Sequence, residues 1–222
     1  MADSEKRYTT HVCTTAEESA LHKALKALRA GKSVVFPTDT VYGVGCDLWQ
    51  PEAIERLYRA KRRPKQMPIP VLVSAPKYTY EVARDIPLSF EEVVDQFWPG
   101  GLTLILPRQS AVPSILCAGG DTIAVRMPAH LWALELIEKA GGALAVTSAN
   151  VSGHPAATTA QEALNDLKGR VSLVIDGGEC PGGMASTIVD LTENPPIILR
   201  AGPLGLCDLQ EVLPRVRLCQ VS

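Results

Sequence analysis

Apolar residues recur every three or four positions in several stretches of the chain, which is the spacing of one helix face. The first stretch contains Leu21, Leu25 and Leu28, and it follows a Thr-Thr-x-Glu-Glu segment at residues 14–18 that predicts a capping box. Gly31 is a natural end for this helix. The same pattern predicts a helix that begins at residue 51 and further helices near residues 90–97, 131–139, 160–167 and 209–216.

Short apolar runs between these helices predict strands. They cover residues 33–36, 69–73, 102–106, 122–125, 143–146, 172–175, 186–191 and 197–200. Pro68 and Pro70 lack a backbone N–H, so the second run is predicted to be an irregular or edge strand. Residues 38–45, with two glycines, are predicted to form a loop. Because strands outnumber helices late in the chain, we expect an α/β domain with a mixed sheet rather than a doubly wound parallel sheet.

The length of 222 residues fits one domain with a substantial core. We expect a flexible N-terminus over residues 1–13, one domain over residues 14–205, and a C-terminal helix and tail over residues 206–222 that pack on it. The N-terminus has no apolar leader, and no run approaches about 18 apolar residues, so a soluble cytoplasmic protein without a membrane segment is predicted. The six cysteines form no C-x-x-C pair, which favours free thiols in a reducing compartment.

The net charge is −2, so the chain as a whole has no electrostatic preference for nucleic acid. Locally, four cations stand within five positions: Lys61, Arg62, Arg63 and Lys65. Charges cannot be buried without partners, so these side chains need anions or water. Two interpretations remain open, a solvated helix end and a clamp for a triphosphate.

Polar residues also follow several predicted strands, where α/β proteins usually bind ligands. Residues 147–150 read Thr-Ser-Ala-Asn, and residues 37–45 place an aspartate between two threonines. Arg126 ends another strand, where its guanidinium would pair with a carboxylate, either of the protein or of a substrate. The phosphate loop G-x-x-x-x-G-K-[ST] and the dinucleotide motif G-x-G-x-x-G are both absent. If the protein handles a nucleotide, it does so at an unusual site.

Six motifs occur in a specific order: PTDTVYGVG, KRRPKQMP, TIAVRMP, TSANVSG, STIVD and ILRAG. Together, from about residue 34 to residue 202, they resemble the YrdC/Sua5 family of threonylcarbamoyl-AMP synthases. The resemblance implies a single YrdC-like domain, in which helices flank a twisted sheet of parallel and antiparallel strands and a concave basic cleft binds ligands.

The family's activity joins L-threonine, bicarbonate or CO2 and ATP into L-threonylcarbamoyl-AMP and pyrophosphate. A downstream transferase complex then modifies adenosine 37 of tRNA to t6A. The resemblance therefore implies ATP as a substrate with Mg2+, L-threonine and bicarbonate as further partners, and at most weak contact with tRNA. Mg2+ is expected on the phosphate oxygens, with Asp39 as one candidate carboxylate and no dedicated protein site.

Matching motif by motif implies a role for each residue. The two named motifs of the family, K-x-R and S-x-N, supply the catalytic set Lys61, Arg63, Ser148 and Asn150. The ATP set is Arg63, Met67, Thr122, Ser148 and Arg200. The threonine set is Thr40, Arg126 and Ser186. Lys61 and Arg63 are expected to face the triphosphate, whereas Arg62 and Lys65 lie outside the motif and are expected to face solvent.

Three positions depart from the family pattern: Met67, Pro70 and Ala185. They leave room for a paralogue that makes a different carbamoyl adenylate. A second alternative is a module that binds double-stranded RNA or tRNA without catalysis, although the chain has few aromatic residues for base stacking.

Overall fold

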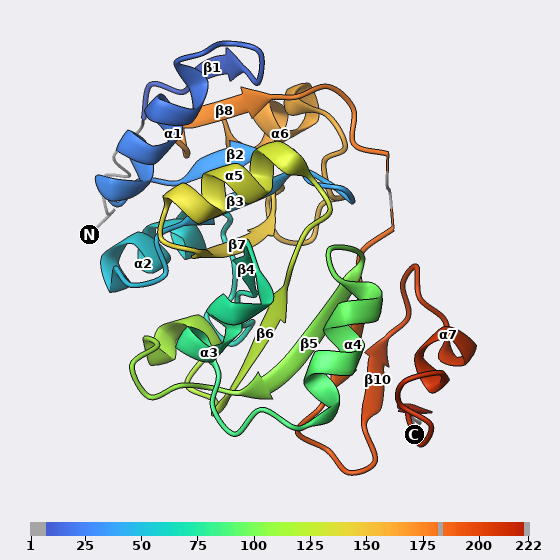
Figure 1. Cartoon of the computed structure of the whole chain (residues 1–222). Helices are drawn as coiled ribbons and strands as arrows, with labels where there is room; N and C mark the ends of the chain where they lie inside the picture. Colours follow the sequence, from blue (N-terminus) through green and yellow to red (C-terminus); the bar gives the residue numbers. More distant parts are fainter. Residues whose placement is uncertain (1–7, 182–183, 220–222) are drawn as a thin grey trace.

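A computed structural model describes residues 8–181 and 184–219 (Figure 1). The described strands are β1 His11–Thr14, β2 Val34–Phe36, β3 Gly43–Cys46, β4 Val71–Val73, β5 Leu102–Pro107, β6 Thr122–Arg126, β7 Ala143–Ser148, β8 Leu173–Asp176, β9 Thr187–Asp190, β10 Ile197–Arg200 and β11 Arg217–Leu218. The helices are α1 Ala20–Arg29, α2 Pro51–Ala60, α3 Thr79–Val82, α4 Ser89–Phe97, α5 Leu131–Lys139, α6 Ala160–Leu167 and α7 Leu206–Gln210, with 3-10 turns at Pro76–Tyr78 and Ser114–Cys117.

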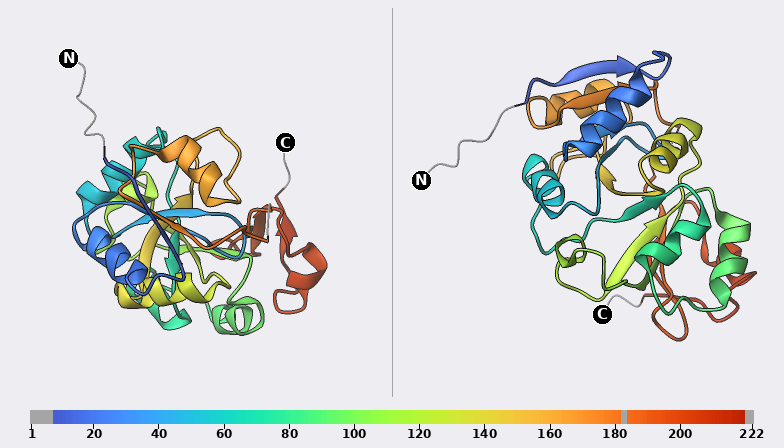
Figure 2. Two further views of the ribbon diagram at one scale, coloured as in Figure 1. Left: turned by 90° about the horizontal axis from the view of Figure 1, so that it is seen from above. Right: turned by 60° about the vertical axis from the view of Figure 1, so that its left-hand side comes forward.

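Within the described residues, these strands form one sheet in the order β1-β8-β2-β3-β7-β4-β6-β5-β9-β10-β11. Four neighbouring pairs on the central side are antiparallel, β2 with β3, β3 with β7, β7 with β4 and β6 with β5, whereas β4 and β6 are parallel. The predicted mixed sheet flanked by helices is therefore confirmed. Figure 2 shows helices lying on both sides of the sheet.

Strand alternation places a separate apolar core on each face of the sheet. On β2, Val34 and Phe36 pack with buried residues of α1 and α5, whereas Val35 faces the other way, toward the core that α2, α4 and α6 cover. A sheet covered on both faces needs apolar residues at consecutive positions, as in Val34–Phe36. This explains why the short strands lack polar alternation.

Several elements differ from the prediction. Residues 11–13 are not part of a flexible tail, because β1 pairs with β8 in parallel; residues 1–7 lie outside the described residues. The predicted capping box is half formed: the carboxylate of Glu17 accepts a hydrogen bond from the Thr14 N–H at 2.9 Å, but α1 begins only at Ala20. At the C-terminal end, α7 ends at Gln210, so turns follow it where a helix was predicted over residues 209–216, and β11 comes after them.

The central strands hold two more differences. Residues 43–46 form β3 rather than a loop, because Gly43 and Gly45 let the strand approach Val146, whose side chain would lie only 2.9 and 3.0 Å from a Cβ atom at the two glycines. The β4 strand is interior, with β7 on one side and β6 on the other. Both prolines precede its paired residues, so the missing N–H groups do not interrupt the ladder.

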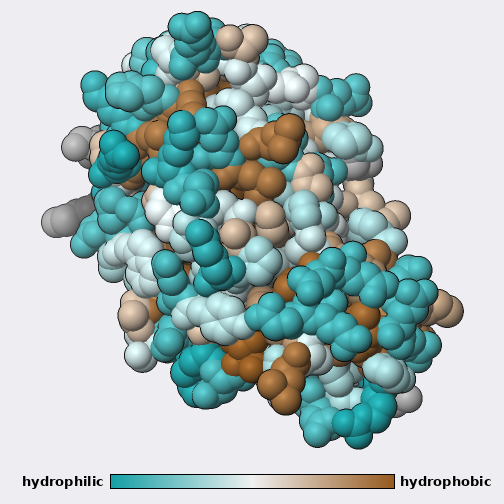
Figure 3. All heavy atoms as spheres, in the orientation of Figure 1, coloured by the Kyte–Doolittle hydropathy of each residue, from teal (hydrophilic) through white to brown (hydrophobic). Residues whose placement is uncertain are grey.

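The strand register brings the polar segments toward the sheet ends. Gly43 lies opposite both Phe36 and Ser148, so the loop after β2 and the turn after β7 emerge together. The start of β9 lies beside the start of β5, and the end of β6 lies beside that same start. Among the described residues, no helix is long and apolar enough to cross a membrane. Hydrophilic side chains cover most of the face in Figure 3, between separate hydrophobic patches.

Candidate functional site

Lys61 connects the basic segment to the Thr-Ser-Ala-Asn turn. It follows the last residue of α2 and is only 1% exposed. Its Nζ donates hydrogen bonds to the main-chain oxygens of Ser148 and Asn150, the second at 2.6 Å. The two motifs, 87 positions apart, therefore meet directly. We call Lys61 together with residues 148–154 the lysine turn.

The position of Lys61 corrects one expectation. Its Nζ points into the lysine turn, where two of its three N–H groups donate to main-chain oxygens, rather than wholly into an open phosphate site. Burial, followed by the positive charge of Arg63, lowers the pKa of Lys61 to about 7, while the negative charge of Asp166 opposes the shift. Arg62 and Lys65 are exposed, as predicted, and Lys65 makes only a surface ion pair with Glu55 at 3.8 Å.

Asn150 organises the rest of the lysine turn from inside. Its Nδ2 donates to the main-chain oxygens of Val151 at 2.9 Å and His154 at 2.8 Å. Its Oδ1 is buried and receives no hydrogen bond from the described residues. Buried side-chain oxygens are nearly always paired, so this acceptor is suited to a donor on a ligand.

Arg63 lies at the same end of α2 but is only partly buried. Its Nε donates to the Met67 main-chain oxygen at 3.1 Å, and its NH2 group donates to that of Pro68 at 2.9 Å. Burial lowers the pKa of Arg63, although a guanidinium stays charged. The Met67 side chain is 45% exposed, so its main-chain oxygen, not its side chain, is the group in contact with Arg63.

Thr122 and Ser148 lie toward the same edge of the sheet. Val71 on β4 pairs with both Val125 and Ala145, and β6 runs antiparallel to β7. Thr122 stands three residues from Val125 in the same direction as Ser148 stands from Ala145. This shared edge agrees with the expected grouping of Thr122 and Ser148, although no direct contact joins them in the described structure.

Arg126 is the centre of a second cluster. It is 8% exposed, and its NH2 group donates to both carboxylate oxygens of Asp39 at 2.8 Å. Its NH1 group donates to Thr40 Oγ1 at 3.0 Å, and its Nε donates to the Gly100 main-chain oxygen at 2.9 Å. Of the two carboxylate partners that the sequence left open for Arg126, the structure contains the internal one, Asp39.

The donor and acceptor roles of the threonine hydroxyls beside Arg126 are fixed by their other hydrogen bonds. Thr38 Oγ1 donates to the Val41 main-chain oxygen at 2.7 Å, so it can only accept from Thr40, 3.2 Å away. Thr40 in turn accepts from Arg126. The charge on the guanidinium thereby orders a chain of two hydroxyls in the loop after β2.

Ser186 and Arg200 complete this region. Arg200 donates through Nε and NH2 to the Ser186 main-chain oxygen at 3.0 and 2.9 Å, and through NH2 to Ser186 Oγ at 3.1 Å. Ser186 Oγ also lies 2.7 Å from Thr103 Oγ1. Gly202 allows this approach, since a Cβ there would meet the Thr187 main-chain nitrogen at 2.3 Å.

Glycines join the two halves of this region. Gly100 accepts from Arg126, and the next residue, Gly101, accepts from the Thr187 N–H at 2.9 Å. Burial first, and then the charge of Arg126, lower the pKa of Arg200. The structure thus places Arg200, expected on the ATP side, beside Ser186 of the threonine set. We call Asp39, Thr40, Arg126, Ser186 and Arg200 the arginine cluster.

Sequence reasoning missed three polar partners. Asp39 was named only as a candidate Mg2+ ligand, yet both of its oxygens bind Arg126. Thr103 and Asp166 were not named, because an isolated hydroxyl in a buried strand or a carboxylate in an amphipathic helix has no distinctive pattern. The threonines on either side of Asp39 were the one available signal.

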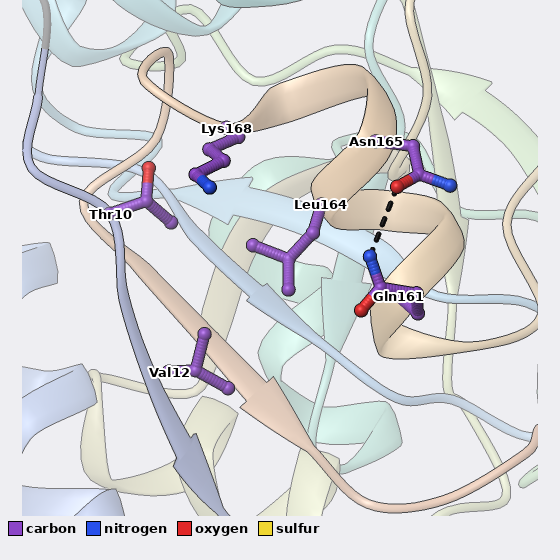
Figure 4. Close-up of a pocket in the computed structure, with 6 residues that line it drawn as sticks. All are labelled: Thr10, Val12, Gln161, Leu164, Asn165 and Lys168. Carbon is purple, nitrogen blue, oxygen red and sulfur yellow. Dashed lines mark hydrogen bonds between the residues drawn. The ribbon is translucent and has the colours of Figure 1, made fainter.

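One cavity lies away from both clusters. A cavity of about 460 Å³ between β1 and α6 is lined by Thr10, Val12, Gln161, Leu164, Asn165 and Lys168 (Figure 4), which include none of the predicted site residues. In the described part of the chain, no three His, Cys, Asp or Glu side chains form a metal-binding group. All six cysteines are free thiols, and four of them are buried.

The sequence model of the Sua5/YciO/YrdC family, described as "Telomere recombination", matches residues 26–202. The chain belongs to this family. A threonylcarbamoyl-AMP synthase of Pyrococcus abyssi is 42% identical over 202 residues, which are 91% of this chain and 59% of that protein. A putative threonylcarbamoyl-AMP synthase of Mycobacterium leprae is 41% identical over 190 residues, 86% of each chain.

The fold comparison agrees with the Sua5/YciO/YrdC assignment. The crystal structure of P. abyssi Sua5 complexed with L-threonine superposes with a TM-score of 0.90 at 40% identity, covering 95% of this chain and 62% of that one. This chain therefore spans about three fifths of the length of its P. abyssi relative. Of the departures from the family pattern, Pro70 keeps its sheet contact, because its main-chain oxygen accepts from the Val146 N–H at 2.9 Å.

Proposed function

We propose that this Sua5/YciO/YrdC protein is a threonylcarbamoyl-AMP synthase. It would join L-threonine, bicarbonate or CO2 and ATP, and release L-threonylcarbamoyl-AMP and pyrophosphate for t6A formation on tRNA. The observation that carries the proposal is the arginine cluster, in which Arg126 binds Thr40 and Arg200 binds Ser186. The M. leprae relative, of which the match covers 86%, and the threonine complex of P. abyssi Sua5 support the same reading.

The arginine cluster suggests how threonine would bind. Arg126 already donates through Nε to Gly100, through NH1 to Thr40 and through NH2 to the Asp39 carboxylate. A bidentate grip on the substrate carboxylate, as expected from the sequence, would compete with Asp39 for the guanidinium. We propose instead that Arg200, through its NH1 group, and the Ser186 hydroxyl hold the carboxylate, while Asp39 accepts from the substrate amine.

The chemistry then needs positioning more than covalent help. The threonine amine adds to CO2, so an N–C bond forms and a proton leaves. An oxygen of the resulting carbamate attacks the α-phosphorus of ATP, and the bond to the β-phosphate oxygen breaks to release pyrophosphate. Arg63 and Arg200 would offset the charge that builds on the phosphate oxygens. The lysine turn would present Ser148 and the open Asn150 acceptor to the nucleotide.

Mg2+ belongs to the proposal only as a partner of ATP. Asp39 is the single carboxylate of the arginine cluster, and no three His, Cys, Asp or Glu side chains of the described residues could hold a metal together, so the arginine cluster does not fit a protein-held metal. The ion would bind through phosphate oxygens, keep most of its waters and neutralise phosphate charge. The concave basic cleft, a cytoplasmic location, the transferase complex that takes the product and any weak tRNA contact are further parts of the proposal.

An assay of pyrophosphate release tests the proposal. The protein is mixed with ATP, Mg2+, bicarbonate and each amino acid in turn, and release should require both threonine and bicarbonate. Arg200→Ala should abolish it, whereas the matched control Arg217→Ala, on exposed β11, should not. Release with a different amino acid would indicate a paralogue. Salt-sensitive RNA binding without release would favour the RNA-binding alternative.

A further inference from the structure

Asp166, on α6, holds the lysine turn from outside. Its Oδ2 accepts the Val151 N–H at 2.8 Å, and both of its oxygens contact His154 Nδ1, at 3.0 and 3.1 Å. These two contacts lie at either end of the segment that Asn150 Nδ2 binds from inside. The segment 151–154 is therefore fixed on two sides by side chains from different elements.

The segment 151–154 also contacts Lys61 through a main-chain hydrogen bond. The Ser152 N–H donates to the Lys61 main-chain oxygen at 2.9 Å, so the lysine turn binds both the main chain and the Nζ of Lys61. A movement of residues 151–154 would consequently change the oxygens that surround Nζ. The α6 helix is well anchored for this purpose, because Thr159 and Glu162 form a reciprocal capping box at its start.

Asp166 is also the negative charge that acts on Lys61. Arg63 opposes the ammonium charge from the segment after α2, and Asp166 favours it from α6. Two further titratable or charged groups lie near: His154, paired with Asp166, and Arg170, whose NH1 group contacts the Ala60 main-chain oxygen at 3.4 Å. Only Asp166 among these four can carry a negative charge.

We propose that Asp166 is a positioning residue, which fixes the lysine turn and keeps the Lys61 ammonium in place for the reaction. This inference rests on the proposed function for its effect on turnover, but its structural part does not. Asp166 touches neither substrate nor the reacting atoms in this account; it acts through Val151, His154 and Lys61. The sequence alone did not single it out.

The structural part is tested by hydrogen exchange on the protein without substrates. Asp166→Ala should raise exchange of the amides at residues 151–154 by about tenfold, the effect of losing one charge-assisted hydrogen bond, while strand amides of β7 stay protected. Asp95→Asn is the matched control, since Asp95 is exposed on α4. Unchanged exchange at residues 151–154 in Asp166→Ala would overturn the proposal, whatever the enzyme turns out to make.

The electrostatic part uses Asp166→Asn, which keeps an oxygen for the Val151 N–H and removes the charge. Without that charge Lys61 loses its proton more easily, so the alkaline limb of the pH–rate profile should move to lower pH by up to about one unit. At pH 5, where Lys61 stays charged even after such a shift, kcat should be within about threefold of wild type. A profile that falls equally at every pH, or that also shifts in Asp95→Asn, would overturn the positioning role.

Discussion

The lysine turn and the arginine cluster bury positive charge in two different ways. The guanidinium of Arg126 is paired with the carboxylate of Asp39, and the two side chains are 9% and 15% exposed, respectively. Lys61 is buried more deeply but contacts main-chain oxygens alone, with Asp166 acting on it without a direct contact. The difference shows in the Lys61 pKa, which burial brings down to about 7.

Because of this difference, the two buried cations should affect the stability of the protein in different ways. The Arg126–Asp39 pair is internally neutral, so it can shape the loop after β2 at any pH at which Asp39 is ionised. The charge on Lys61 is not neutralised, so its burial lowers stability and its proton can be lost near neutral pH. We infer that the arginine cluster keeps its structure over a wide pH range, whereas the structure of the lysine turn depends on whether Lys61 is protonated.

Arg126→Ala should have the largest effect on stability. It leaves the Asp39 carboxylate in a mostly buried place without its partner, which should lower the free energy of unfolding by about 3 kcal/mol. Urea unfolding measures this loss. Adding Asp39→Asn to the variant should recover part of it; a loss below about 1 kcal/mol in the single variant would show that the pair does not hold the structure of the arginine cluster.

Lys61→Met should show the clearest contrast with Arg126→Ala, because turnover should fall strongly while stability changes little. The variant leaves the Asn150 main-chain oxygen without a donor, but it also removes a buried charge, so stability should fall by no more than about 1 kcal/mol. Turnover should nevertheless fall by at least about a hundredfold, because the lysine turn loses its anchor. Urea unfolding and the pyrophosphate assay, run on one preparation, make the comparison. Near-normal turnover would contradict the role given to Lys61.

The pH dependence of stability should also differ. Lys61 loses its proton near pH 7 when folded but near pH 10.5 when unfolded. Between these values the unfolded chain binds more protons, so the stability of wild type relative to Lys61→Met should rise with pH, by up to about 1 kcal/mol per pH unit. Urea unfolding at pH 6 and pH 9 tests the sign. A relative stability that does not change between pH 6 and pH 9 would mean that Lys61 keeps its proton in the folded protein.

Lys65→Ala should have the smallest effect, although Lys65 belongs to the same basic segment. Its ion pair with Glu55 spans 3.8 Å between half-exposed side chains, and such pairs contribute little. Stability should change by less than about 0.5 kcal/mol and turnover by less than about twofold. A large loss of ATP affinity would show that the whole segment, rather than Lys61 and Arg63, meets the nucleotide.

The sequence predicted the central elements well because their apolar spacing is regular, as in β2, β5, α2 and α6. It missed β3, since two glycines in four residues are typical of loops and only the neighbouring Val146 makes them necessary. It grouped the site residues by motif but could not foresee that Lys61 would turn inward, because its acceptors are main-chain oxygens with no sequence signature. The partner of Arg126 stayed open for a different reason, because Asp39 lies 87 positions away in the sequence.

The central claim is that both clusters serve the synthesis of a carbamoyl adenylate from threonine. Mass spectrometry of the product formed from 13C-bicarbonate, L-threonine, ATP and Mg2+ tests it most directly. The account predicts a threonylcarbamoyl-AMP that carries the heavy carbon in wild type and is missing in Arg200→Ala. An adenylate without the label, or AMP and pyrophosphate as the only products of freshly quenched reactions, would contradict it.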